Sequence, residues 1–396
     1  MRILLILYVL YYVCDLLFPA MVGGVEVENN SNRIYPQTCM GIIFVYSLYF
    51  IMKNYKRLII NIVTRPFIYY LLFVAIYIFF TNGQRTLFDN FVQFMKITLA
   101  ICTFFSFYLG LASGMQNAKY LYVIFWIMFF YALFSLVKDY YVIMVAEMDK
   151  SAEGFDSNSG FLLASLIPMS IIMPFKYLKI GIYFFVLVAC MFSGQRAAAV
   201  GAFVTLPVVL KYFKQFFVKK DFVLLLIFAI ISLVIALPFI SNSIENFILR
   251  ADVDSNRGDI GSGRSIFWSL AINSFFSGNP FNMLLGHGYF AINDMLEQKY
   301  GLAIGAHNGF IDHLYTFGIV GLLLYVSIYF VLYKQYVLLK NSKSDYSSIV
   351  LIMLLMLILR SATSHGWFDI SYMPFFMTFS IIMANKKKES IYDVTK

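Results

Sequence analysis

The chain has 396 residues, of which 61% are hydrophobic, 19% aromatic and only 13% charged. In a water-soluble globular protein about a quarter of the residues would be charged, so that class is excluded. A membrane β-barrel is excluded as well, because its strands alternate apolar and polar residues, whereas residues 222–240 and 318–332 are apolar on every face. The composition predicts an all-α polytopic membrane protein.

Hydropathy predicts about twelve transmembrane helices, since a helix crosses the bilayer with about 20 apolar residues. The first is interpreted as a retained anchor, because no small-residue cleavage site follows it. The twelve spans are expected near residues 3–20, 38–52, 66–81, 88–110, 120–137, 159–175, 178–193, 196–210, 222–240, 307–333, 347–363 and 371–384.

The connections between these spans alternate in charge. Residues 53–65 and 211–220 are basic, whereas 22–37, 138–159 and 241–306 are polar or acidic. Because basic connections stay in the cytoplasm, both termini are expected there. The net charge of +9 is therefore mostly an orientation signal. No nucleic-acid partner is expected, since no folded basic domain lies outside the spans.

We expect one integrated membrane domain in three sections. Residues 1–240 would form helices one to nine, residues 241–306 a large outward loop, and residues 307–396 helices ten to twelve with a cytoplasmic tail. Within the loop, Arg264 to Phe276 has the apolar spacing of a helix, and a helix of this kind is expected to lie along the outer membrane interface.

A few cations on the outward side are candidates for binding an anion. Arg196 follows Ser193-Gly194-Gln195 in a short outward turn, and Arg264 opens the loop helix. Arginine pairs bidentately with phosphate oxygens, and a helix N-terminus favours an anion. The alternative is a boundary arginine that contacts lipid headgroups. Lys96 and Arg360 are cations within spans and are further candidates.

All four histidines, His287, His307, His313 and His365, fall on the outward side. A neutral imidazole accepts a proton from a hydroxyl near physiological pH. Position favours His307, which lies where the large loop re-enters the membrane. Asp312 and His313 lie deeper in the same span and are expected to orient neighbours. His287 lies between two glycines, where it fits a structural role in a turn, and all three residues are further candidates for the site.

Two other patterns carry weaker signals. Asp252-Val253-Asp254 has the Asp-x-Asp pattern of divalent-ion sites, but such patterns are common in polar loops, and we expect no metal and no cofactor. The four cysteines are interpreted as small buried hydrophobic residues. Cys14 and Cys39 both fall near the outer ends of their spans, where a disulfide is compatible with the sequence but has no support from it.

Four motifs follow one another between residues 193 and 321. They are Ser193-Gly194-Gln195-Arg196, Gly263-Arg264-Ser265-Ile266-Phe267-Trp268, Leu285-Gly286-His287-Gly288-Tyr289, and His307-Asn308 followed by Phe317-Gly318-Ile319-Val320-Gly321. In this order they resemble the bacterial O-antigen polymerase and O-antigen ligase superfamily. The chain departs from the family at Gln195, where a small residue such as Ser is common.

The resemblance implies a metal-independent, inverting glycosyltransferase with a GT-C-like helical fold. It implies an undecaprenyl-diphosphate-linked oligosaccharide as donor, at the periplasmic face of the bacterial inner membrane. Family roles fall on Arg196 and Arg264 as diphosphate ligands and on His307 as the group that activates the acceptor hydroxyl. Family analogy also implies a chain-length regulator protein as a partner.

Two activities of the superfamily and one unrelated function compete. The overall sequence pattern of residues 307–321 favours a polymerase, which joins repeat units, over a ligase, which transfers the glycan to lipid A–core. A polysaccharide flippase is the third interpretation. It would bury charges near the membrane midplane, whereas the charged residues of this chain gather near the outer surface.

Overall fold

The computed structural model describes most of the chain. The described residues are 2–17, 21–22, 25–26, 34–59, 63–80, 85–114, 118–145, 159–174, 176–193, 195–216, 223, 227, 230–231, 234, 264–301, 305–364, 368 and 370–394.

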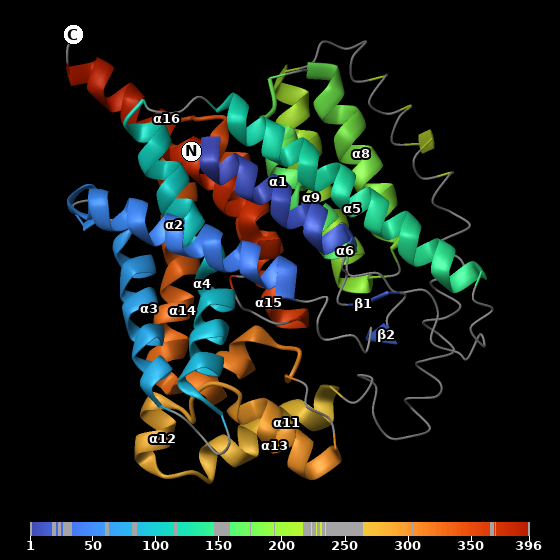
Figure 1. The fold of residues 1–396 in the computed structure, drawn as a ribbon. Helices are drawn as coiled ribbons and strands as arrows, with labels where there is room; N and C mark the ends of the chain where they lie inside the picture. Colours follow the sequence, from blue (N-terminus) through green and yellow to red (C-terminus); the bar gives the residue numbers. More distant parts are fainter. Residues whose placement is uncertain are drawn as a thin grey trace.

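Helices make up nearly all of the described residues, which confirms the predicted all-α polytopic class (Figure 1). The helices before the large loop are α1 (Arg2–Leu17), α2 (Ile34–Ile59), α3 (Arg65–Ile76), α4 (Leu87–Ala112), α5 (Lys119–Val145), α6 (Ser159–Ser165), α7 (Ile167–Ile172), α8 (Lys176–Phe192) and α9 (Arg196–Phe216). Those after it begins are α11 (Arg264–Phe276), α12 (Pro280–Leu285), α13 (Ala291–Tyr300), α14 (Gly309–Asn341), α15 (Tyr346–Thr363) and α16 (Met373–Val394). Short 3-10 helices span Tyr77–Phe79 and Ile370–Tyr372, and β1 (Met21–Val22) pairs with β2 (Val25–Glu26).

Among the described residues, six helices are long and apolar enough to cross a membrane, by length and composition. They are Ile34–Lys56, Leu87–Ala112, Lys119–Tyr141, Ala197–Lys214, Gly309–Asn341 and Tyr346–Thr363. Four more predicted spans correspond to shorter apolar helices, Ile3–Leu17, Arg65–Phe79, Ser159–Ile172 and Tyr177–Phe192. Most of the predicted span 222–240 lies outside the described residues, and 371–384 falls within the longer α16.

Two predicted spans differ from the structure in shape. The span 159–175 is divided into α6 and α7, which meet at Leu166, two residues before Pro168. Proline lacks an amide N–H, so Pro168 cannot donate to the carbonyl one turn back, and it is tolerated in the first turn of α7, where that donor is not needed. The span predicted at 307–333 begins at Gly309 and continues as α14 to Asn341, eight residues beyond the predicted end.

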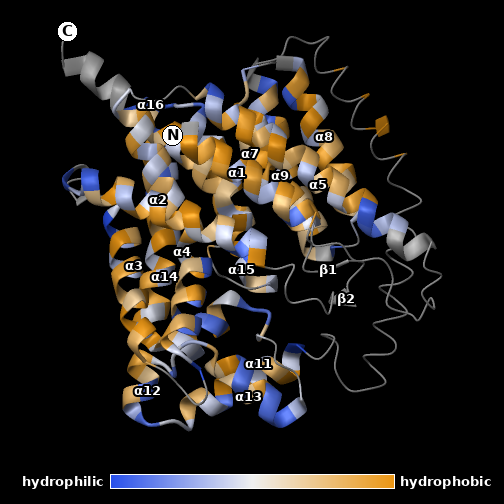
Figure 2. Cartoon of the chain, in the orientation of Figure 1, coloured by the Kyte–Doolittle hydropathy of each residue, from blue (hydrophilic) through white to orange (hydrophobic). Residues whose placement is uncertain are grey.

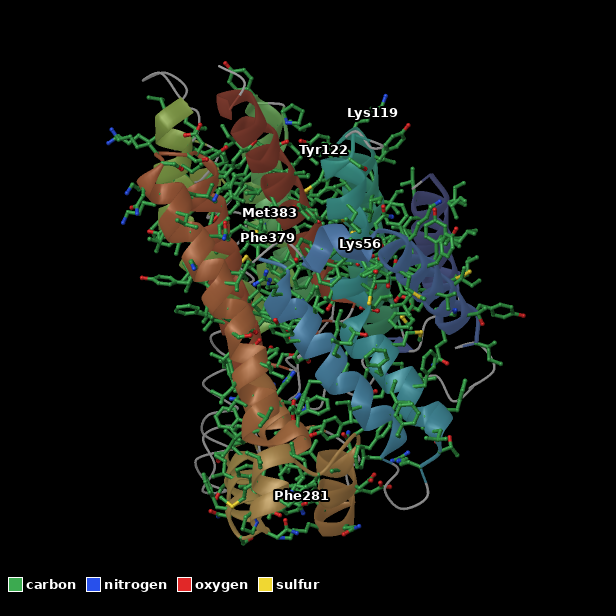
Figure 3. All side chains as sticks on the ribbon, turned by 90° about the vertical axis from the view of Figure 1, so that its left-hand side faces the viewer. Lys56, Lys119, Tyr122, Phe281, Phe379 and Met383 are labelled. Atoms are coloured by element: carbon green, nitrogen blue, oxygen red, sulfur yellow. The ribbon has the colours of Figure 1, made fainter. Side chains whose placement is uncertain are left out.

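Helix α4 forms the centre of the membrane bundle and packs against α2 and α16. The apolar window of α4 is 94% buried, as expected for a helix that is hydrophobic all round. Its Thr103 and Ser106 hydroxyls donate to carbonyls one turn back in the same helix, so these buried polar groups are satisfied. Side chains fill the spaces between the helices, among them Phe379 and Met383 of α16 (Figure 3).

Helices α11, α12 and α13 form a cap at one end of the bundle, and the start of α1 and the end of α16 lie toward the other end (Figure 1). The predicted loop helix Arg264 to Phe276 coincides with α11. Ala271 and Phe275 of α11 are buried in a second small core, together with residues of α13 and α14. The bundle is mainly hydrophobic, whereas the cap is more mixed (Figure 2).

Candidate active site

The last turn of α15 is the point at which the cap meets the bundle. The guanidinium of Arg264, the first residue of α11, donates from Nη1 to the carbonyl oxygen of Thr363 at 3.3 Å. The side-chain amide of Asn308 donates to the carbonyl oxygen of Ala362 at 3.2 Å. Carbonyls at a helix C-terminus lack partners within the helix, so they are ready acceptors for both side chains. The start of α11 in the cap and the turn before α14 are thereby held on one helix end.

His307 lies beside this contact in an unusual backbone conformation. Its φ is 54°, in the left-handed region that few residues other than glycine adopt. Such a conformation persists only where the surrounding structure determines it, and it is typical of functional sites. The side chain is half-buried. The surrounding structure therefore holds the backbone of His307 in this conformation.

The residues on both sides of His307 are fixed by hydrogen bonds. The amide of Ala306 donates to Oδ1 of the buried Asp312 at 2.9 Å, and its carbonyl accepts from the indole Nε1 of Trp268 at 2.7 Å. On the other side, Oδ1 of Asn308 caps α14 by accepting from the first amides of that helix. Asp312 thus positions the His307 turn, a role consistent with the expectation that it orients a neighbour.

Arg360 lies one turn before Thr363 in α15 and is surrounded by aromatic rings. Its guanidinium carbon is 4.1 Å from the ring centroid of Tyr372 and 5.1 Å from that of Phe161. The Nη atoms donate to the carbonyl and hydroxyl oxygens of Ser371. The buried Nε has no hydrogen-bond partner among the described residues. Ring faces attract a cation without neutralising it, so Arg360 keeps its charge.

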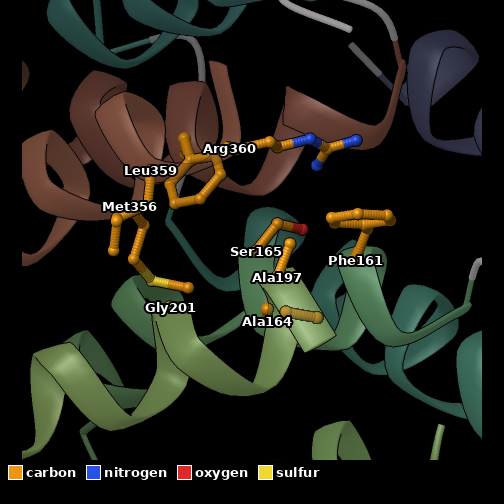
Figure 4. A pocket seen from close by; sticks show the side chains of 10 residues that line it. Phe161, Ala164, Ser165, Ala197, Gly201, Met356, Leu359 and Arg360 are labelled. Carbon is orange, nitrogen blue, oxygen red and sulfur yellow. The ribbon is translucent and has the colours of Figure 1, made fainter. Parts of the chain in front are cut away.

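A recess of about 280 Å³, counting its open mouth, lies between α6, α9, α15 and α16 (Figure 4). Arg360 is the one charged residue among those that line it. The other lining residues are Phe161, Ala164 and Ser165 of α6, Ala197, Ala198 and Gly201 of α9, Met356 and Leu359 of α15, and Phe375 of α16. The recess is therefore apolar, with a cation in its wall.

Arg196 is the first residue of α9, and the next residue, Ala197, lines this recess. The Arg196 side chain lies outside the described residues. Ser193 fixes the start of α9, because its buried hydroxyl donates to the carbonyl of Cys190 at 2.7 Å and accepts from the Gln195 amide at 3.3 Å. The structure thus brings the backbone of Arg196 beside the recess that Arg360 lines.

Comparison with known proteins covers part of this region. Residues 181–326 match the family model described as O-Antigen ligase. This portion of the chain is therefore similar to the O-antigen ligase and polymerase superfamily. Its members are glycosyltransferase-like membrane enzymes of lipopolysaccharide biosynthesis. No curated protein matches the chain.

The superfamily match includes Arg196, Arg264 and His307, whereas Arg360 and Phe161 lie outside it. Sequence reasoning placed Arg360 among the further candidates but gave no indication of its aromatic neighbours. The roles of Asn308 and Trp268 were also not predicted. Both residues stand in the motifs: Asn308 directly follows His307, and Trp268 is four residues after Arg264. This nearness to a candidate site residue is the signal that points to them.

Two superfamily motifs meet in a close backbone contact. Gly286 has φ +80°, and a Cβ atom there would come within 2.4 Å of the backbone nitrogen of Gly318. Gly318 has φ +67° in the middle of α14, and the contact is reciprocal. Two glycines are required because neither position has room for a side chain. This contact attaches the cap to α14 and accounts for both motifs structurally.

Of the three other histidines, the structure describes His287 and His313. His313 is fully buried, and its ring stacks on Tyr325. Its Nε2 forms a hydrogen bond with the Tyr70 hydroxyl at 2.8 Å, and its Nδ1 forms one with the Gly309 carbonyl at 2.6 Å. With both nitrogens engaged, it packs α14 against α3. His365 lies outside the described residues.

His287 stacks on Tyr315 with ring centroids 4.5 Å apart, and its backbone amide donates to the Tyr315 carbonyl. Burial lowers the pKa of His287 below its usual value of 6.5. These contacts pack the His287 ring against α14 in the turn between Gly286 and Gly288. The described residues contain no group of three or more His, Cys, Asp or Glu side chains that could hold a metal ion, and Asp252 and Asp254 lie outside them.

Proposed function

We propose that the protein is a polymerase that joins undecaprenyl-diphosphate-linked oligosaccharide repeat units into O-antigen or a related surface polysaccharide. The reaction would be a metal-independent, inverting glycosyl transfer at the periplasmic face of the bacterial inner membrane. The observation that carries the proposal is that Arg264 and Asn308, the neighbour of His307, both bond to the last turn of α15, the helix of Arg360.

The donor diphosphate fits the cations around this helix end. Arg264 and Arg360 both lie in or against the last turns of α15, and Arg196 begins α9 beside the recess. Arginine guanidinium groups match phosphate oxygens bidentately. In this arrangement they would bind the diphosphate and stabilise the charge that develops on it as it leaves.

The recess suits the lipid part of the donor. An undecaprenyl diphosphate has an apolar chain joined to an anionic group, and the recess combines apolar walls with the Arg360 cation. Small residues on α9, Ala197, Ala198 and Gly201, leave the space open. The first isoprene units of the lipid would lie against these apolar walls, with the diphosphate near Arg360.

His307 would act as the general base. Its imidazole accepts the proton of the acceptor sugar hydroxyl as that oxygen bonds to the anomeric carbon of the donor glycan. The bond from the anomeric carbon to the diphosphate oxygen breaks on the opposite face, and undecaprenyl diphosphate leaves with that electron pair. Attack opposite the leaving group inverts the anomeric centre, and the polysaccharide gains the donor's glycan.

O-antigen ligase is the second candidate, favoured by the description of the matching family model. A ligase uses the same donor but transfers the glycan to lipid A–core. Lipopolysaccharide gels of a deletion strain separate the two activities. A single repeat unit on the core is the expected result for a polymerase, whereas bare core with accumulated lipid-linked polymer indicates a ligase.

A further inference from the structure

Two cysteines from neighbouring helices lie in contact. The Sγ atoms of Cys14 in α1 and Cys39 in α2 are 4.0 Å apart. Both side chains are half-buried, and the two helices pack along each other. The remaining cysteines differ from this pair, because Cys102 and Cys190 are fully buried within the bundle.

The pair lies where a disulfide would join the two helices at one end. Cys14 is in the last turn of α1 and Cys39 in the second turn of α2, on either side of the connection that contains β1 and β2. The predicted topology places this connection on the outward side, where disulfides form and persist. The positions are separated by 25 residues, so a bond here closes a moderate loop.

We propose that Cys14 and Cys39 form an intramolecular disulfide that fastens α1 to α2. A disulfide has an S–S distance of about 2.05 Å, so the two sulfurs, now 4.0 Å apart, need to approach by about 2 Å to form the bond. The oxidant is a thiol–disulfide oxidase on the outward side. Two thiols of this chain exchange with the oxidase's disulfide, which takes up the two hydrogens and is reduced to two thiols. The proposal is independent of the proposed glycosyl transfer.

The test counts free thiols in the full-length protein isolated from its own membrane. The protein is denatured in the presence of a maleimide-linked polymer that retards it on a gel, with or without prior reduction. A disulfide leaves two adducts without reduction, on Cys102 and Cys190, and four after reduction. Four adducts without reduction would overturn the proposal.

Matched variants identify the partners. Cys14→Ser should carry three adducts with or without reduction, because Cys39 is then unpaired. The double variant Cys102→Ser with Cys190→Ser should carry no adduct before reduction and two after it. Peptide mass spectrometry of the wild-type protein should find the peptides of Cys14 and Cys39 joined and lighter by two hydrogen atoms. A disulfide that joins two copies of the chain on a non-reducing gel would contradict the intramolecular bond.

Discussion

The side-chain amide of Asn308 donates to the carbonyl oxygen of Ala362 at 3.2 Å, and this bond ties the turn that carries His307 to the helix that carries Arg360. On the same turn of α15, the carbonyl of Thr363 accepts from Arg264. Three segments distant in sequence are therefore held together at one helix end. A catalytic site for glycosyl transfer needs such a fixed arrangement of base and cations.

Removal of either cation should weaken donor binding. Arg264→Ala and Arg360→Ala each delete charge-assisted hydrogen bonds, which contribute about 1.5–3 kcal/mol. The KM for the lipid-linked donor should rise roughly 10- to 100-fold, measured with purified protein in detergent. Lys299→Ala is the control, because Lys299 is an exposed cation of α13 in the same cap. A donor KM unchanged by both arginine substitutions would contradict the diphosphate site.

Filling the recess should exclude the lipid. A Cβ at Gly201 would meet only the Cε atom of Met356 within 4 Å, at 3.9 Å, so Gly201→Ala should leave activity close to the wild-type level. Gly201→Leu extends into the recess and should lower the rate with a lipid-linked donor, while the protein keeps its melting temperature. Full activity of a folded Gly201→Leu variant would argue against lipid in this recess.

The glycine contact between the cap and α14 should tolerate no side chain. Gly286→Ala and Gly318→Ala each place a Cβ within 2.5 Å of backbone atoms at a positive φ. Gly301→Ala is the matched control, since φ is +71° there but no atom lies within 4 Å of the added Cβ. The control should cost about 1–2 kcal/mol, and the other two considerably more. Thermal unfolding in detergent measures the difference, and equal effects at all three positions would contradict the contact.

The cap should lose stability in acid because of His287. Its folded pKa lies below the usual 6.5, so the unfolded chain binds a proton first as the pH falls. The stability is fully present above about pH 6.5 and declines as the pH falls toward the lowered folded value. The protection factors of the amides in α12 and α13, which are corrected for the intrinsic exchange rate at each pH, should therefore fall below this pH. His287→Phe keeps a ring to stack on Tyr315 and should flatten the dependence, and an unaltered profile would remove His287 as the cause.

Local patterns in the sequence predicted much of the fold. The helix Arg264 to Phe276 was predicted with the bounds that α11 has, because its apolar spacing is visible within 13 residues. Arg264 and His307 were selected as cations and bases on the outer side, and the structure places both at the cap–bundle junction. The charge of a residue is visible at its own position, and its membrane side is predicted from the order of apolar spans and basic connections. Both are therefore accessible from the sequence.

Contacts between segments distant in the chain could not be predicted from these local patterns. Arg264 donates a hydrogen bond to a carbonyl 99 residues further along the chain. Every residue has a backbone carbonyl, so no residue type marks this acceptor in the sequence. His313 looked like a functional candidate in a span, yet its partner is Tyr70, separated from it by 243 residues. The packing of α3 against α14 shows that both ring nitrogens of His313 form hydrogen bonds inside the bundle.

The most direct test of the central claim is the rate at which purified protein extends lipid-linked repeat units when His307 is replaced by Asn. Asparagine tolerates the left-handed backbone of this turn, and the hydrogen bonds of Ala306 and Asn308 remain. The account predicts that His307→Asn keeps the wild-type melting temperature and loses roughly 10²- to 10⁴-fold in rate. A folded His307→Asn protein that extends chains at the wild-type rate would contradict it.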